Sequence, residues 1–596
     1  MILQSTLHKD LKSISEGEYI FLGPWCLDKV PLIEPNSLKY SEDRILPPFG
    51  HSFSEQLQID YLYEKYYYEC FDLFIGALNN VHCEKFSKRF WEISIGSWYN
   101  RFFSLILNRY LHLKKSIHKN SNISEHRGVK IDLDYIVSDD EKLSVNMIKD
   151  QKWNAIVYTI LVENFFDLDQ TLEDFSENIE TKLTRGKSFL KSLFVNKQIS
   201  FLNSSIFIYK PYISPFRNVL LQLRLGQIPV LWDDKEILLS HKTNHKIRKL
   251  LQKKMLVDND DLLSVLCYML PLLIPRIFLE DFKITMESLD QIGFPTNVKV
   301  IYTANGFAGD SLFQLWAANK VLSGTRYVVG QHGNNYGTLK LSTFWPEMNT
   351  SDKFISWGWR DPENKYVSKI IPLGNIIKRK FTNQYSNKSN LDRILIIMKG
   401  HGNRSSLSCR SFEYFLELNT VLKLSKKLLE NTNLTLTIRM HNNSDFREMN
   451  FLDLSLKKYK DKIKIENTNK KLSKSIYEND LVIFSYDSTG FLECLQSKIP
   501  VMSIYPNSSI RLFPKTLKYY DNMKKLDLIH YSYISMTKLI KDLAENKDAW
   551  LLWKIKIKDH IDIKEFNKEF NEFCISPEKE IADLLIAEKK LFDEYR

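Results

Sequence analysis

Three polar residues that can do chemistry follow two apolar runs in the middle of the chain. Asn305 and Asp310 come just after VKVIYTA, and His332 follows RYVVG in the segment VVGQHGNNYGT of residues 328–338. A histidine at a strand end can carry a proton, and a carboxylate can act as a base or a nucleophile. We therefore predict Asn305, Asp310 and His332 as catalytic residues. A plain acid at a helix start, favoured by the helix dipole, is the alternative for Asp310.

Glycines surround the histidine. Gly330, Gly333 and Gly337 lie within seven residues of one another, with two asparagines between them. Glycine permits backbone conformations and close approaches that other residues resist. A histidine of the core does not need three glycines around it, so we expect the segment to lie against a ligand.

A second set of polar residues begins a later helix. In FSYDSTGFLECL a strand is expected to end at Tyr486, and Ser488, Thr489 and Gly490 form the turn into a helix. Hydroxyls and free N–H groups at a helix start make an anion site, and Glu493, one turn further on, can accept hydrogen bonds from a ribose. The pattern predicts a nucleotide-sugar site, with a capping box as the alternative.

Two other strand ends carry positive charge. Lys399 and Gly400 follow RILIIM, where the glycine lets the backbone approach a ligand. Arg439 and His441 end the strand TIRMH, and its alternation places both on one face, where a phosphate can be met. An ordinary turn and a surface pair are the alternative interpretations.

These residues need strands to place them, and two series of strands and helices supply them. The first is expected to contain the strands KIDLDYIV, SSIFIYKPYI, IPVLWD, VKVIYTA, RYVVGQ and KFISWGW, and the second the strands RILIIMKG, LTLTIRMH, KIKIEN, LVIFSYDSTG and IPVMSIYP. Alternating strands and helices predict an α/β fold with two doubly wound, Rossmann-like domains facing a cleft. The expected domains are 1–380 with an aromatic helical insertion over about 53–120, 390–540, and C-terminal helices over 541–596.

Composition limits the function. The 596 residues carry a net charge of +11, which suits anionic partners, but no nucleic-acid motif is present and nucleic-acid binding is not expected. The seven cysteines are far apart without CxxC, and no DxD follows a strand, so we expect reduced thiols and no metal or other cofactor. The start has no apolar signal region, and no apolar run reaches about 18 residues. The sequence indicates a cytoplasmic protein, with peripheral contact to the inner membrane face left open.

Several motifs together resemble a family of transferases found among surface-carbohydrate biosynthesis genes. They are YIFLGPWC, TANGFAGDSLFQLWAA, RYVVGQHGNNYG, FISWGW followed by IPLGN, and SYDSTGFLE, and they span Tyr19 to about Pro506. The family is similar to retaining transferases that use CMP-activated Kdo and, more distantly, to polyol-phosphate polymerases of teichoic acid synthesis. One departure is GNN where GGN is expected, and Asn334 tolerates a left-handed backbone at little cost.

The resemblance implies a metal-independent GT-B glycosyltransferase. Its donor, CMP-Kdo or a related ulosonic acid, would bind the C-terminal domain at Lys399, Arg439, His441, Ser488, Thr489 and Glu493, and the acceptor, a surface-polysaccharide or lipopolysaccharide glycan, would lie near Asn305, Asp310 and His332. Asp310 would be the nucleophile of a retaining reaction, with His332 orienting it; in an inverting reaction either residue would be the base. A CDP-polyol phosphotransferase and a non-catalytic nucleotide- or glycan-binding scaffold are the alternatives.

Overall fold

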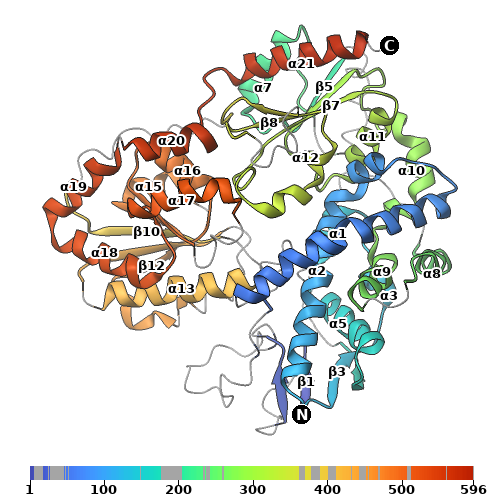
Figure 1. Ribbon diagram of the computed structural model, residues 1–596, viewed down its shortest axis with the longest axis horizontal. Helices are drawn as coiled ribbons and strands as arrows, with labels where there is room; N and C mark the ends of the chain where they lie inside the picture. The colour runs from blue at the N-terminus through green and yellow to red at the C-terminus, as the bar shows by residue number, and fades with distance from the viewer. Residues whose placement is uncertain are drawn as a thin grey trace.

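The structure is a computed structural model that describes residues 1–5, 18–23, 26, 46, 49–50, 53–147, 150–175, 205–232, 235, 242–257, 261–360, 369–376, 389–399, 411–430, 432–441, 452–453, 455–466, 470–505, 512–558 and 560–594. These residues form three sheets in which all neighbouring strands are parallel. Figure 1 shows the sheet of β10–β15 with its helices on one side of the molecule and the other two sheets on the opposite side.

The smallest sheet lies at the N-terminus and has the order β2-β1-β3-β4. Its strands are β1 (Ile2–Gln4), β2 (Tyr19–Phe21), β3 (Glu125–Val129) and β4 (Asp169–Glu173). The fully buried His126 links three of them, because Nε2 is 2.9 Å from Ser5 Oγ and Nδ1 is 3.1 Å from Gln170 Oε1. This sheet is therefore held by side-chain contacts as well as by its backbone ladder.

Helices of 4 to 32 residues accompany this sheet. They are α1 (Phe53–His82), α2 (Lys88–Lys119), α3 (Leu133–Ile136), α4 (Glu141–Met147) and α5 (Gln151–Phe165). Helix α2 is buried on most sides, since it packs against α1, α9, α11 and α12. Aromatic residues of α1 and α2, such as Tyr67 and Phe103 with ring centroids 5.2 Å apart, form the core between them, as the sequence suggests.

The middle sheet has the strand order β5-β6-β7-β8-β9. The strands are β5 (Ile206–Tyr209), β6 (Val300–Thr303), β7 (Arg326–Gly330), β8 (Lys353–Ser356) and β9 (Ile370–Pro372). The helices of this region are α7 (Pro215–Arg224), α8 (His245–Lys254), α9 (Asp261–Leu273), α10 (Phe282–Ser288), α11 (Ser311–Leu322) and α12 (Pro346–Thr350), with 3-10 turns η4 (Arg276–Phe278), η5 (Leu289–Gln291) and η6 (Lys340–Phe344). Because β5, β6 and β7 run parallel, their carboxyl ends meet at one edge.

The third sheet has the order β12-β11-β10-β13-β14-β15, which is that of a doubly wound nucleotide-binding fold. Its strands are β10 (Arg393–Ile397), β11 (Thr435–Arg439), β12 (Ile463–Glu466), β13 (Leu481–Phe484), β14 (Val501–Ile504) and β15 (Ile529–His530). The strand order reverses between β10 and β13. In such sheets, ligands bind beyond the carboxyl ends of the two strands at this switch point.

Helices cover this sheet and close the chain. They are α13 (Ser411–Leu429), η8 (Lys457–Tyr459), α15 (Leu472–Glu478), α16 (Thr489–Gln496), α17 (Pro514–Lys525), α18 (Tyr533–Glu545), α19 (Lys547–Lys558), α20 (Ile561–Phe570) and α21 (Pro577–Glu594). Helix α21 leaves the third sheet and packs on α7, β6 and β7 of the middle one, as Figure 1 shows in red. A salt bridge of 2.6 Å between Arg326 and the buried Glu588 fixes it there.

Asn571, between α20 and α21, touches both halves of the molecule. Its side chain is fully buried, accepts a hydrogen bond from Asn375 at 2.7 Å, and donates to the carbonyl of Leu492 in α16 at 2.9 Å. Gln496 at the end of α16 donates to the Asn571 carbonyl at 3.1 Å. The segment between α20 and α21, where the chain returns from the third sheet to the middle one, is therefore hydrogen-bonded to Asn375, which follows β9, on one side and to α16 on the other.

The structure differs from the sequence predictions in several places. The expected N-terminal domain of residues 1–380 contains two sheets, although its helical part is formed as expected by α1 and α2. KIDLDYIV is not a strand, because Asp132 caps helix α3 by accepting from Tyr135 N. Residues 228–232 of IPVLWD do not form a strand either, since the side chain of Gln222 satisfies both the N–H and the carbonyl of Val230.

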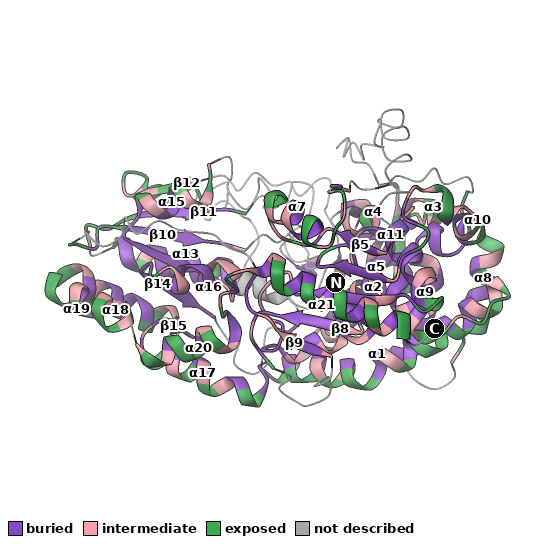
Figure 2. Ribbon diagram, turned by 90° about the horizontal axis from the view of Figure 1, so that it is seen from above, coloured by how far each residue is buried: buried purple, intermediate pink, exposed green. Residues whose placement is uncertain are grey.

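Burial follows the layers. In Figure 2 most strands of the two larger sheets are coloured as buried, whereas the outer faces of the helices are exposed. The six described cysteines are free thiols. In the part of the chain that the structure describes, we find no helix that combines the length and the apolar character needed to cross a bilayer.

Candidate functional site

The site begins in the loop that follows β5. Lys210 and Tyr212 have positive φ angles of 44° and 58°, which residues other than glycine rarely adopt. Non-glycine residues held in this region cluster at functional sites, where surrounding contacts must hold them. Lys210 Nζ reaches Asp310 Oδ2 at 3.4 Å, and the ring of Tyr212 is 6.1 Å from that of His332. The loop thus connects the two predicted catalytic residues.

Asp310 is placed as a helix cap. Its Oδ1 accepts from Phe313 N at 3.1 Å at the start of α11, and its Oδ2 accepts from the Tyr209 hydroxyl and faces Lys210. The residue is only 6% exposed. Both carboxylate oxygens therefore have protein donors, as in the capping alternative, which leaves little nucleophilic freedom.

Asn305 is exposed just beyond β6. The turn around it is fixed by the Thr303 hydroxyl, which accepts from Gly306 N at 2.8 Å. A side chain at Gly306 would collide with Tyr209, since a Cβ there would be 2.6 Å from that ring. The ring of Phe307, from the same turn, lies 5.3 Å from that of His332. The ends of β5, β6 and β7 are thus brought together around the histidine.

His332 is held by the tyrosine one turn later. Its Nδ1 is 3.0 Å from the hydroxyl of Tyr336, and that hydroxyl donates to Glu347 Oε1 at 2.5 Å. Burial, with the nearby charge of Arg101, lowers the pKa of His332 to about 4. The imidazole is therefore neutral at physiological pH and does not change its charge near pH 7, in contrast to an exposed histidine. Among the described residues, none hydrogen-bonds to Nε2.

Glu347, in the first turn of α12, is 6% exposed. Burial raises its pKa to about 7, although the bonds from Tyr336 and its own backbone N–H and the charge of Arg101 oppose the shift. Burial beside this carboxylate also raises the pKa of Tyr336 well above its usual value. Neither Tyr336 nor Glu347 was predicted from the sequence, and the spacing of four residues from His332 to Tyr336 was the available signal.

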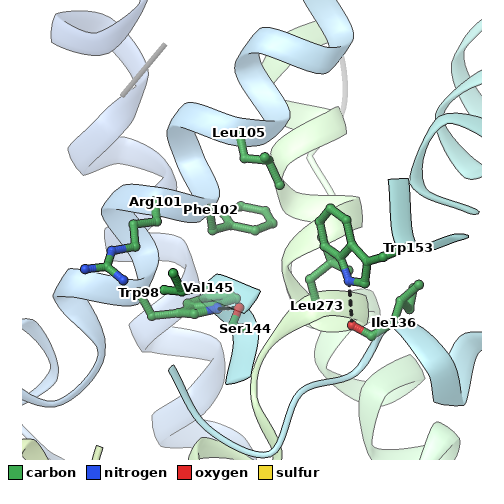
Figure 3. Close-up of a pocket in the computed structure, with 9 residues that line it drawn as sticks. All are labelled: Trp98, Arg101, Phe102, Leu105, Ile136, Ser144, Val145, Trp153 and Leu273. Atoms are coloured by element: carbon green, nitrogen blue, oxygen red, sulfur yellow. Dashed lines mark hydrogen bonds between the residues drawn. The ribbon is translucent and has the colours of Figure 1, made fainter. Parts of the chain in front are cut away.

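Arg101 supplies positive charge from helix α2. Figure 3 shows its guanidinium pointing away from an apolar lining that includes Phe102, Trp153 and Leu273. That lining encloses a cavity of only about 10 Å³, which cannot hold a sugar or a nucleotide. Arg101 Nη1 lies 3.4 Å from Glu141 Oε1.

Glu141 of α4 holds the elements around the site together by hydrogen bonds. It is fully buried and accepts from Ser97 Oγ at 2.7 Å, Gly309 N at 3.0 Å and Gln314 Nε2 at 2.9 Å. These bonds tie α2, the turn before α11 and α11 itself to α4. The sequence analysis did not single out Glu141.

The glycines around His332 have mostly structural causes. A Cβ at Gly330 would lie 2.9 Å from the Tyr302 hydroxyl, and one at Gly337, where φ is +71°, would overlap the ring of Trp359. Only Gly333 has open space, with Thr489 Oγ1 at 4.0 Å. The left-handed asparagine is Asn335, with φ of 79°, and not Asn334 as the sequence suggested. Core packing therefore explains two of the three glycines.

Some of the predicted donor residues lie at the switch point of the third sheet. Lys399 follows β10 and Ser488 follows β13, the two strands between which the order reverses. Ser488 caps α16 by accepting from Gly490 N at 2.9 Å, and a Cβ at Gly490 would lie 2.8 Å from the Phe484 ring. Lys399 Nζ lies 6.0 Å from the centre of the Tyr486 ring. A cation and a helix N-terminus thus meet where nucleotides bind in such folds.

The two predicted sets of residues meet through Asn334. Its backbone N–H donates to Thr489 Oγ1 at 3.1 Å, and its side chain donates to Asp487 Oδ1 at 2.6 Å. Asp487 also accepts from the Tyr520 hydroxyl at 2.8 Å. The loop that carries His332 therefore lies directly against the N-terminal end of α16.

The remaining predicted donor residues are placed differently. Arg439 is buried at the end of β11, one strand beyond the switch point, and binds Glu466, Ser475 Oγ and the Lys470 carbonyl. This placement does not favour a ligand contact. His441 is exposed while Arg439 is buried, so the two do not share an environment, and Glu493 is buried within α16. Gly400 lies outside the described residues.

A surface hollow of about 400 Å³ lies near the junction. It is lined from both halves, by Gly337 and Arg360 from the first and by Lys515, Lys518 and Tyr519 from α17. The cations outnumber the acid, Glu569, in its lining. Of the predicted site segments, only VVGQHGNNYGT contributes to it. Within the described residues, no group of three histidine, cysteine or acidic side chains is arranged to hold a metal ion.

Comparison with known proteins gives a family. The model of the LIC12162 family transferase matches residues 1–585. No curated protein matches the chain.

Three of the solved structures that the chain matches can be named. They are MnaA of S. aureus with UDP (TM-score 0.34, 12% identity, 61% of this chain and 94% of that one), MurG of Acinetobacter baumannii (0.32, 9%, 65% and 100%) and TarM of S. aureus (0.31, 13%, 50% and 55%). The chain thus spans about half the length of TarM. At TM-scores below 0.5, nothing about substrate follows. The parallel sheets themselves have the α/β, Rossmann-like organisation that the sequence predicts.

Proposed function

Because the chain belongs to the LIC12162 family of transferases, we propose that it is a GT-B glycosyltransferase that uses a nucleotide-activated sugar. The observation that carries the proposal is the contact of Asn334 with Thr489 and Asp487. It sets a neutral histidine of one sheet beside the switch point and helix N-terminus of another. A transferase needs such a pair of sites, one for an anionic leaving group and one for the nucleophile.

The donor phosphate would bind at the switch point. The N-terminal end of α16 offers free backbone N–H groups with the helix dipole behind them, and Lys399 adds a full positive charge on the neighbouring strand. The hydroxyl of Thr489 can donate to a phosphate oxygen, since Asn334 N occupies only an acceptor position. These groups would stabilise the charge that develops on the departing nucleotide phosphate.

His332 would be the base that activates the acceptor. An acceptor hydroxyl gives its proton to Nε2, its oxygen bonds to the anomeric carbon, and the bond from that carbon to the nucleotide phosphate breaks with its electron pair on the phosphate. A neutral imidazole can accept the proton, and the lowered pKa of His332 keeps it neutral. Asp310 would hold the start of α11 and the loop after β5, because its oxygens are already bonded.

The donor we propose is CMP-linked Kdo or a related ulosonic acid, and the acceptor a surface polysaccharide or lipopolysaccharide. The support is the resemblance of the motifs, and the cationic hollow at the junction suits an acidic sugar. No metal ligand is needed in this scheme. The reaction would take place in the cytoplasm, where nucleotide-activated sugars are made.

A thermal-shift screen against CMP, CDP, UDP, GDP and dTDP tests the proposal, since a ligand of the native state raises the melting temperature. Stabilisation by CMP above the others supports the ulosonic acid donor. A preference for CDP favours a polyol-phosphate transferase, and one for UDP, GDP or dTDP a hexose donor. The Lys399→Ala variant is the control that should lose the shift. No response to any nucleotide by the folded protein would contradict the proposal and favour a non-catalytic scaffold.

A further inference from the structure

Three side chains form one hydrogen-bonded line that leads from the reacting histidine into the protein. His332 Nδ1 meets the Tyr336 hydroxyl at 3.0 Å, and that hydroxyl meets Glu347 Oε1 at 2.5 Å. Tyr336 is 3% and Glu347 6% exposed, so water does not compete for these bonds. The turn after β7 supplies two members, and the first turn of α12 supplies the third.

The line has a direction, because a hydroxyl has one proton to give. An ionised Glu347 accepts that proton in a hydrogen bond, so the oxygen of Tyr336 can only accept from Nδ1–H. The Nε2 atom of a neutral imidazole then carries the lone pair. We propose that Tyr336 and Glu347 are positioning residues that hold His332 in its Nδ1–H form, with Nε2 free to take the acceptor's proton. The role in catalysis rests on the proposed function, whereas the tautomer is a property of the free protein.

The opposite state of the line follows from protonating Glu347. The carboxylic acid then donates to the Tyr336 oxygen, the Tyr336 hydroxyl donates to Nδ1, and the imidazole proton moves to Nε2 by exchange with solvent. In that state the base is lost. Burial raises the pKa of Glu347 to about 7 and lowers that of His332 to about 4, so the carboxyl changes state well before the imidazole becomes charged.

The charged groups around Glu347 do not change the order in which Glu347 and His332 take up a proton as the pH falls. The titratable and charged groups that act on it or respond to it are Arg101 of α2, Glu141 of α4, Tyr336, Tyr327 of β7 and Tyr67 of α1. The Arg101 guanidinium favours the ionised carboxylate, whereas Glu141 opposes it, and the tyrosines are neutral in this pH range. Loss of the Nδ1–H form is therefore expected as the pH falls through about 7.

Nitrogen-15 NMR of the full chain labelled in its histidines tests the inference without any substrate. The His332 signals are identified as those missing from His332→Gln, and the tautomer is followed from about pH 8.5 to about pH 5.5. We expect the Nδ1–H form at the upper end and the Nε2–H form at the lower end, without an imidazolium signal. The Nε2–H form at about pH 8.5 would overturn the inference.

Two variants and a control sharpen the test. In Tyr336→Phe and in Glu347→Gln the tautomer ratio should no longer depend on pH. Tyr327→Phe also removes a buried tyrosine hydroxyl, from β7, and should leave the pH dependence unchanged. If Tyr336→Phe and Glu347→Gln both keep the wild-type profile, the line does not control His332.

Turnover gives a second readout once a donor is known. Tyr336→Phe should lower kcat about 10- to 100-fold with KM nearly unchanged, as supporting residues of a site do. A protein without nucleotide binding or turnover would refute the proposed function, while the NMR measurement would still decide the state of His332. Equal kcat values for Tyr336→Phe and the wild type would refute the catalytic part alone.

Discussion

Replacing Thr489 by valine removes one hydroxyl at the start of α16 and little else. Valine keeps the branched shape of threonine, so the packing of the helix should persist. In the structure Thr489 Oγ1 accepts from Asn334 N at 3.1 Å, and no described residue accepts its proton. That proton is the one we expect a donor phosphate to use.

The size of the effect follows from these two bonds. A hydrogen bond to a charged group contributes about 1.5–3 kcal/mol, so its loss should raise the nucleotide Kd about 10- to 150-fold. The bond from Asn334 is neutral and lies in a half-exposed loop, so its loss should cost about 0.5–1.5 kcal/mol of stability. The two losses appear in different measurements, which keeps them apart.

Isothermal titration with the nucleotide that gives the largest thermal shift measures the first. Thr489→Ser keeps the hydroxyl and should bind nearly as tightly as the wild type. Ser532→Ala removes a similar N-cap from α18, away from the switch point, and should leave the Kd unchanged. If Thr489→Val also binds within about twofold of the wild type, the hydroxyl does not contact the donor and the assignment of this helix start fails.

The other predictions concern the supports of the site and of the small sheet. Asp310→Ala should lose about 1–3 kcal/mol of stability, because the α11 cap and the acceptor of Tyr209 disappear. Asp310→Asn keeps the cap oxygen but replaces the oxygen that faces Tyr209 and Lys210 by an amide nitrogen, so it should lose less stability than Asp310→Ala and should retain turnover; abolished turnover in this variant would restore the nucleophile interpretation. Glu141→Ala removes the acceptor of Ser97 Oγ and Gly309 N, one of the two acceptors of Gln314 Nε2, and the ion-pair partner of Arg101, so it should cost about 3–5 kcal/mol, measured by urea unfolding, with Glu141→Gln costing less. Burial lowers the pKa of His126 to about 4, so the unfolded chain binds a proton that the native state refuses, and stability should be lost as the pH falls from about 6.5 to about 4. His126→Gln should show a smaller loss between these pH values; an equal loss would mean that other groups cause it.

Much of the α/β alternation was readable from the sequence. β6, β7, β10, β11 and β13 are short buried strands rich in branched residues, and each begins or ends within a few residues of its predicted run. The three-residue strands β1 and β9 were missed because they carry too little pattern. The errors at KIDLDYIV and IPVLWD arise where one polar side chain, Asp132 or Gln222, satisfies backbone groups that a strand would otherwise pair.

The candidate site could be predicted in part. His332, Asp310 and Thr489 were found because strand ends and helix starts are local signals. Their partners are not local. Glu141 and Gly309 are 168 positions apart, and the bond between them depends on how α4 meets the turn before α11. Arg439 was predicted as a ligand contact because its sequence neighbours do not reveal its actual partner. That partner is Glu466, which lies on the next strand and accepts its hydrogen bond.

Because α16 is hydrogen-bonded to Asn571, a rotation between the halves of the molecule would move its two ends by different distances. The chain passes between the halves twice, between β9 and β10 and again after α20, so a rotation of one half that leaves both passages in place would turn about the line through them. The hydrogen bond between Gln496 and Asn571 holds the C-terminal end of α16 near that line, while Thr489 lies at the N-terminal end of the helix. Eight residues at about 1.5 Å each give an arm of about 12 Å, and a rotation of about 10° would move its tip by about 2 Å. That displacement is enough to break the hydrogen bond from the Asn334 N–H to Thr489 Oγ1.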